Sequence, residues 1–184
     1  MSVYYATYDL RNGYIDNWLA AGPQAIEVTD LERFTGDDFK LQIAQHYYEG
    51  DAGITQDPVE YAKFQVGGDE ELRWRYFRCA DDHFVDLTDF YHICHYLRGW
   101  AFARVVSPVE QQVTLVLTTN GPADVWLRGK HVHRQEHFHH QIPHSVSFTA
   151  TLEEGPNAVL VRVEEVATRE CPFAMALQIV DPAN

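Results

Sequence analysis

Residues 96–105 read Tyr-Leu-Arg-Gly-Trp-Ala-Phe-Ala-Arg-Val, and this stretch decides the fold class. Ala101, Ala103 and Val105 alternate in it with larger or charged side chains. Alternation with a period of two is typical of a β-strand whose two faces meet different surroundings. The same period recurs in five further segments: 71–78, 113–118, 145–151, 159–164 and 173–180. The pattern therefore predicts an all-β chain.

Turn signals separate these segments at Asn120-Gly121-Pro122, Arg128-Gly129-Lys130 and Gly155-Pro156-Asn157. Glycine adopts positive φ at no steric cost, and proline removes a hydrogen-bond donor from a strand ladder, so such clusters end strands. Short strands with turns between them predict an antiparallel β-sandwich of the jelly-roll type.

Two stretches have the features of short helices, Thr29–Phe34 and Asp86–Tyr96. Thr29 and Thr88 are candidate caps. We expect Lys40–Tyr48 to form a strand and Glu49–Pro58 to form a loop.

The chain has 184 residues, a length that suits a single domain over 1–184. In this division, 1–35 supplies an N-terminal strand with a short helix, and 72–181 supplies the main body of the sandwich. Residues 182–184 have the composition of the start of a linker, so the chain is expected to be part of a longer protein.

The charge balance bears on possible partners. The formal net charge is −13, with 46% hydrophobic and 22% charged residues. This composition is typical of a folded domain and excludes a disordered chain. An acidic surface repels phosphate backbones and anionic lipids, so we expect neither nucleic acid nor membrane as a partner.

The ends and cysteines predict a cytoplasmic protein. Residues 1–10 lack the basic and apolar regions of a secretory signal. Three widely spaced cysteines, Cys79, Cys94 and Cys171, are expected to be reduced and buried, although one disulfide with a spare thiol stays possible.

Several motifs in order resemble the galactose-binding-like jelly-roll modules that accompany bacterial glycoside hydrolases and related sugar-processing enzymes. The matching segments are Asn17–Pro23, Trp74, Val85–Leu87, Tyr96–Ala101, Val113–Leu117, Val125–Lys130 and Leu152–Val161. The resemblance implies a jelly-roll sandwich that serves as a non-catalytic accessory module, for carbohydrate contact or for packing on a neighbouring domain. Many modules of that family are spacers that bind no sugar, so the resemblance argues against catalysis in this chain itself.

One position departs from the family pattern. Arg128-Gly129 stands where the family usually has Asn-Gly, whose two residues both tolerate positive φ. Because arginine tolerates that conformation less well, we expect a different turn type or a longer loop.

Aromatic side chains are the candidate carbohydrate contacts, because sugar rings stack their C–H faces on aromatic rings. Val125 and Leu127 are expected to point inward, which leaves Trp126 on the opposite face, either for sugar stacking or for contact with a covering loop or neighbouring domain. Tyr91 and His92 lie in a connection and could edge a shallow site.

Tyr48 adjoins the loop that begins at Glu49, which makes it a fourth carbohydrate candidate. Trp74 is expected to belong to the core. Self-association of the β-domain is a further possible partnership.

Histidines suggest the alternative, a cupin-like metal-dependent enzyme. Six of the ten histidines lie between residues 131 and 144. His131 and His133 would share one face of a strand and, with Glu136, could bind a transition metal. The spacing departs from the cupin pattern, since the gap from histidine to glutamate is one residue short and no second motif follows.

No other cofactor is expected, although a structural calcium ion stays possible. Asp81, Asp82 and Asp86 offer the hard oxygen ligands that calcium prefers.

Overall fold

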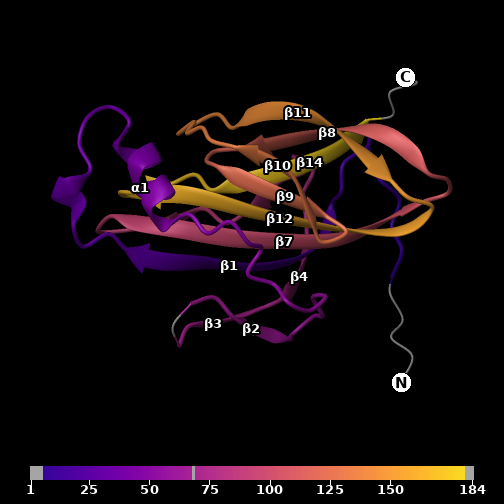
Figure 1. The fold of residues 1–184 in the computed structure, drawn as a ribbon, viewed down its shortest axis with the longest axis horizontal. Helices are drawn as coiled ribbons and strands as arrows, with labels where there is room; N and C mark the ends of the chain where they lie inside the picture. The colour runs from indigo at the N-terminus through magenta and orange to yellow at the C-terminus, as the bar shows by residue number, and fades with distance from the viewer. Residues whose placement is uncertain (1–5, 68, 181–184) are drawn as a thin grey trace.

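Two antiparallel sheets face each other in the computed structural model, which describes residues 6–67 and 69–180 (Figure 1). The six-stranded sheet has the order β10-β9-β12-β7-β1-β4, and the four-stranded sheet has the order β11-β8-β14-β5. The predicted all-β antiparallel sandwich is therefore confirmed.

The elements have the following bounds. The six-stranded sheet contains β1 (Asn17–Glu27), β4 (Arg75–Arg78), β7 (His95–Ser107), β9 (Ala123–Leu127), β10 (Lys130–Gln135) and β12 (Gly155–Ala167). The four-stranded sheet contains β5 (Val85–Asp86), β8 (Gln111–Thr119), β11 (His144–Leu152) and β14 (Ala174–Val180). Two small sheets pair β2 (Lys63–Gln65) with β3 (Glu71–Arg73) and β6 (Asp89–Phe90) with β13 (Glu170–Cys171). The helices are η1 (Leu31–Arg33) and α1 (Phe39–Tyr47).

The main core lies between the two sheets. Alternate residues of the long strands point into it, among them Leu97, Leu117 and Val161, and all are fully buried. The face of the six-stranded sheet that points away from this core is also covered. Trp100 and Trp126 lie in a second apolar cluster on that outer face, which the β2–β3 hairpin and residues 52–54 cover.

Helix α1 covers the end of the same outer face, at the left of Figure 1. The prediction of a strand over Lys40–Tyr48 is wrong. Phe39, Ile43 and Tyr47 are four residues apart and all belong to the third apolar cluster, so the helical period decides the segment.

The expected helix over Asp86–Tyr96 is also wrong. The segment contains β5, β6 and the first residues of β7, with a bend between β6 and β7. Asp86 and Asp89 accept backbone hydrogen bonds from Thr88 and Phe90, which stabilise turns rather than a helix. The other predicted helix, Thr29–Phe34, forms only the short η1.

The hairpin between β9 and β10 corrects another expectation. Arg128 has φ 53° and Gly129 has φ 77°, and Leu127 pairs directly with Lys130. Two central residues with positive φ make the tight two-residue turn that Asn-Gly usually forms. Arg128 adopts the left-handed conformation, so neither a longer loop nor a different turn type is needed.

All three cysteines are buried and free, as predicted. None of the helices in the described ranges has the length and apolar character that crossing a bilayer requires. The expected linker start at 182–184 lies outside the described residues, and the division into 1–35 and 72–181 stays a prediction.

Candidate functional site

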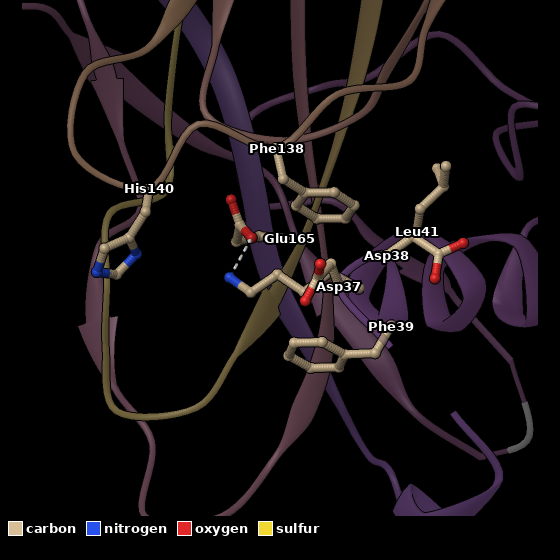
Figure 2. Close-up of a pocket in the computed structure, with 8 residues that line it drawn as sticks. Asp37, Asp38, Phe39, Leu41, Phe138, His140 and Glu165 are labelled. Atoms are coloured by element: carbon tan, nitrogen blue, oxygen red, sulfur yellow. Dashed lines mark ion pairs between the residues drawn. The ribbon is translucent and has the colours of Figure 1, made fainter. Parts of the chain in front are cut away.

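A pocket of about 300 Å³ lies where α1 begins, beside the connection between β10 and β11 and near the end of β12 (Figure 2). It is lined by Asp37, Asp38, Phe39, Lys40, Leu41, Phe138, His140 and Glu165. We call it the α1 pocket. Its volume is at the lower end of the range of small-molecule sites, which suits a ligand of about one ring.

The packing of α1 places one wall of the α1 pocket. Ile43 and Ala44 are fully buried against the outer face of the six-stranded sheet. This contact fixes the first turn of the helix, so Phe39 and Lys40 stand at the mouth of the pocket. Phe138 packs against the same cluster, and Figure 2 shows its ring beside Glu165, with the Phe39 ring beyond the dashed ion pair of Glu165 and Lys40.

A buried carboxylate forms the floor. Glu165 is 3% exposed, its Oε1 lies 3.6 Å from Lys40 Nζ, and the backbone N–H of Val166 donates to the same oxygen at 2.9 Å. Burial raises the pKa of Glu165 to about 7, although Lys40 and the backbone hydrogen bond act in the opposite direction. Lys40 Nζ also lies 5.6 Å from the centre of the Phe138 ring, within the range of a cation–π contact.

This arrangement offers two kinds of contact to a ligand. Two half-buried phenyl rings present apolar surface, and Glu165 with Lys40 presents an acceptor and a donor between them. Exposed Asp37 and Asp38 at the rim make the pocket acidic as a whole. The acidic rim disfavours an anionic ligand.

Trp126 lies at a second pocket, of about 250 Å³. The ring is only 5% exposed and shares the pocket wall with Phe102 and Leu160, under residues 52–58. Val125 and Leu127 point into the main core, as predicted. The structure therefore agrees with the covering-loop interpretation of Trp126, and an open stacking face is not present.

Tyr48 lies near Trp126 on the same outer face. The two rings are 5.6 and 5.2 Å from the Arg162 guanidinium carbon, and the Arg134 guanidinium covers one face of Tyr48 at 3.8 Å. The Tyr48 hydroxyl donates to Asp124 at 3.4 Å. Burial is the main cause that raises the pKa of Tyr48. Its ring is thus part of a charged network.

Tyr91 and His92 belong to another region, beside β6 and β13. Tyr91 is half-buried against the main core, and its backbone N–H donates to Arg169. His92 is exposed, with its ring against Phe90. The structure brings Trp126 and Tyr48 together and keeps Tyr91 and His92 apart from them. Sugar contact by these four side chains stays a prediction.

The cupin-like triad does not assemble. A β-bulge between His131 and His133 puts the two rings on opposite faces, so the shared-face prediction is wrong. His131 Nε2 lies 2.8 Å from Asp124, whereas His133 stacks on Phe148 with ring centres 4.0 Å apart. Glu136 accepts a hydrogen bond from Arg134 at 2.9 Å. Each proposed ligand has a different partner.

The remaining metal candidates are also engaged elsewhere. Asp81 pairs with Arg11, while Asp82 and Asp86 accept backbone hydrogen bonds in turns. His137, His139 and His144 contact one another through their rings. Across residues 6–67 and 69–180, no three His, Cys, Asp or Glu side chains are grouped in a way that could hold a metal ion.

Burial next to His139, His144 and His133 lowers the pKa of His137 to about 4. The ring is therefore neutral at physiological pH.

The residues of the α1 pocket were not predicted from the sequence. Its wall depends on the helical period of α1, which was assigned to a strand. Glu165 could have been found from the sequence, because only Arg162, Glu164 and Glu165 interrupt the apolar run from Ala158 to Ala167. A charged residue in such a strand is buried only when it is paired or functional.

No protein-family model matches the sequence, and no curated protein matches it. Similar solved structures include a family 35 carbohydrate-binding module from Clostridium thermocellum, at 14% identity and a TM-score of 0.37, over 54% of this chain and 88% of that one.

Two enzymes are also similar in part. One is a β-glucosidase from Kluyveromyces marxianus, at 14% identity and a TM-score of 0.46, over 68% of this chain and 16% of that one. The other is a GH26-CBM35 β-(1,4)-mannanase from Podospora anserina, at 14% identity and a TM-score of 0.34, over 73% of this chain and 27% of that one. These three structures are thus one carbohydrate-binding module and two sugar-processing enzymes.

Proposed function

We propose that this chain is a non-catalytic carbohydrate-contact module of a larger sugar-processing protein, and that the α1 pocket holds one uncharged sugar ring. The observation that carries the proposal is the placement of two half-buried phenyl rings around a buried Glu165–Lys40 pair in a pocket of about 300 Å³.

The chemistry of the α1 pocket supports a sugar. A pyranose ring has apolar C–H faces and a belt of hydroxyl groups. Phe39 and Phe138 can cover the C–H faces, while Glu165 accepts from one hydroxyl and Lys40 donates to another. The exposed Asp37 and Asp38 favour a neutral ring over a uronic acid.

The proposal is for binding rather than bond cleavage. Glu165 is held by Lys40 and by the Val166 N–H, which fixes the carboxylate as a hydrogen-bonding group. The jelly-roll motifs in the sequence support this proposal, and the similar structures described above include a carbohydrate-binding module. A longer protein would then supply the catalytic domain on which the sandwich packs.

A binding measurement tests the proposal. Calorimetry with neutral monosaccharides and their uronic acids should give binding of at least one neutral sugar and weaker binding of its uronic acid. Phe138→Ala should weaken that binding at least tenfold, a loss of about 1.4 kcal/mol. Phe90→Ala is the matched control, because Phe90 is an exposed ring that does not line the α1 pocket. Unchanged affinity in a folded Phe138→Ala protein would contradict the proposal.

A further inference from the structure

Two exposed tyrosines lie at the free edge of the six-stranded sheet, away from the α1 pocket. Tyr76 is on β4, the edge strand, and is 44% exposed. Tyr8, in the segment that precedes β1, is 52% exposed. Their rings stack with centres 6.4 Å apart and planes 20° from parallel. Single exposed aromatic side chains are common on folded domains, whereas two that lie together form a continuous aromatic surface.

A hydrogen bond holds the Tyr76 ring in place. The Tyr76 hydroxyl donates to Asn17 Oδ1 at 2.7 Å, and the Tyr8 ring lies against the Tyr76 ring. The neighbouring Tyr8 is the main cause that raises the pKa of Tyr76. The Tyr76 ring is therefore positioned before any ligand arrives, which reduces the entropy that binding would cost.

From this pair we infer a second glycan contact, in which Tyr8 and Tyr76 form an open platform for the C–H faces of an uncharged polysaccharide. The inference rests on the proposed function of the chain as a carbohydrate-contact module. The platform has apolar ring faces with hydroxyl groups at one rim, so it matches the apolar faces and hydroxyl belt of a sugar. Its openness on the surface suits a long chain better than a single ring.

The platform and the α1 pocket are separate. Glu165 pairs with Leu97, and Leu97 pairs with Ala25. Six residues further along β1, Leu19 pairs with Tyr76. Three strand spacings (about 14 Å) and six residues along a strand (about 20 Å) place the two sites roughly 25 Å apart. A monosaccharide can therefore occupy only one site, whereas a polysaccharide offers many sugar units to both.

Two contact points on one module raise its affinity for a polymer through effective concentration, without changing its affinity for a single sugar. Loss of the platform should therefore weaken the binding of polysaccharides and leave the binding of monosaccharides unchanged.

The test compares variants on both kinds of ligand. Affinity gel electrophoresis would use three soluble neutral polysaccharides, galactomannan, mixed-linkage β-glucan and arabinoxylan, and calorimetry would use their component monosaccharides. Tyr8→Ala and Tyr76→Ala should each weaken polymer binding at least tenfold and leave monosaccharide binding within twofold. Tyr76→Phe keeps the ring and should keep most of the binding. Phe90→Ala is again the matched control for loss of an exposed ring.

Each outcome decides between the two sites. Polymer binding lost in Phe138→Ala but unchanged in the folded tyrosine variants would overturn the platform and leave the proposed function standing. Polymer binding lost in the tyrosine variants and kept in Phe138→Ala would support the platform and contradict the pocket. No binding of any of the three polymers by the unaltered protein would overturn the platform. Thermal unfolding of each variant separates loss of contact from loss of fold.

Discussion

The two faces of the six-stranded sheet are both buried, but they are built in different ways. The inner face is apolar throughout its centre, with Leu97 and Val161 packed against the four-stranded sheet. The outer face carries a network of charged side chains, and α1 and residues 48–58 pack over it. Asp124 is 0% exposed and accepts from Arg134 at 2.7 Å and from Arg162 at 3.1 Å.

The charges on the outer face are matched across the strands. Arg162 pairs in register with Asp124, and Arg98 pairs with Glu164. Residues of the covering segment complete the network, since Arg162 donates to the Asp51 carbonyl at 2.7 Å and Arg98 to the Glu49 carboxylate at 2.9 Å. The inner face therefore depends on the amount of apolar area buried, and the outer face depends on particular partners.

The largest effect is expected from Asp124→Ala. The change leaves the buried Arg162 guanidinium and the half-buried Arg134 guanidinium without their shared carboxylate, and breaking one side of a buried pair costs about 3–5 kcal/mol. Urea unfolding at pH 7 would measure the loss. A loss below 1 kcal/mol would show that the outer network is solvated and would remove the contrast between the two faces.

In the main core that the inner face shares with the four-stranded sheet, Leu117→Ala should cost about 3 kcal/mol, because it removes buried methyl groups and leaves a cavity. Leu117 is fully buried on β8. Leu117→Met, which nearly conserves volume, should cost less than about 1.5 kcal/mol. The comparison predicts that only this face tolerates a conservative substitution, so Asp124→Asn should still be costly in the same urea measurement.

The inner face was predictable because its alternation is complete. Every second residue from Val159 to Val163 is apolar, and a strand with one face in a core is the simplest structure that uses such a pattern. The outer face was not predictable, because residues 48–58, which pack over it, show no periodic pattern of apolar residues. The sequence shows charges in otherwise apolar strands, such as Asp124 within Ala123–Leu127, but it does not show which partners meet them.

The candidate site was harder still to predict. Leu41 and Ile43 alternate with polar residues and imitate a strand, while the helical spacing of Phe39, Ile43 and Tyr47 is what the third cluster uses. The bulge that separates His131 from His133 likewise cannot be predicted from the pattern of apolar and polar residues. A one-residue irregularity moves the side chains that follow it to the other face of the strand. A prediction that places two side chains on the same face fails wherever such an irregularity lies between them.

Glu165 makes the free energy of unfolding depend on pH. Its pKa in the folded chain is about 7, against an ordinary value of 4.5. Between these values the folded protein binds more protons than the unfolded chain, so Glu165 lowers the free energy of unfolding as pH rises from 4.5 to 7. The whole effect is at most about 3.5 kcal/mol, at about 1.4 kcal/mol per pKa unit.

Glu165→Gln should remove that pH dependence, so the variant gains stability relative to the unaltered protein as pH rises from 4.5 to 8. Urea unfolding at several pH values would measure the difference. Exposed Glu154→Gln is the matched control and should run parallel to the unaltered protein. Parallel curves for Glu165→Gln as well would mean that the carboxylate is not desolvated in the α1 pocket.

The smallest effect is expected at the β9–β10 hairpin, which belongs to neither buried face. Arg128 holds φ 53° and forms an ion pair with Glu153, and both side chains are about half exposed. Asparagine tolerates the left-handed conformation better than arginine, whereas an exposed ion pair is worth about 0–1 kcal/mol. The two contributions oppose each other in a single Arg128→Asn substitution, so that variant alone would show little change in thermal or urea unfolding.

Combining two substitutions separates these contributions. In a Glu153→Gln background the ion pair is already lost, and Arg128→Asn should then stabilise the protein by about 0.5–1 kcal/mol through the backbone alone. Destabilisation in that background would mean that the arginine stem packs on the hairpin. Either result is several times smaller than the loss expected for Asp124→Ala. The turn faces solvent, so the backbone strain at Arg128 involves no desolvated charge. The outer face of the sheet differs from the turn because its charged groups are desolvated.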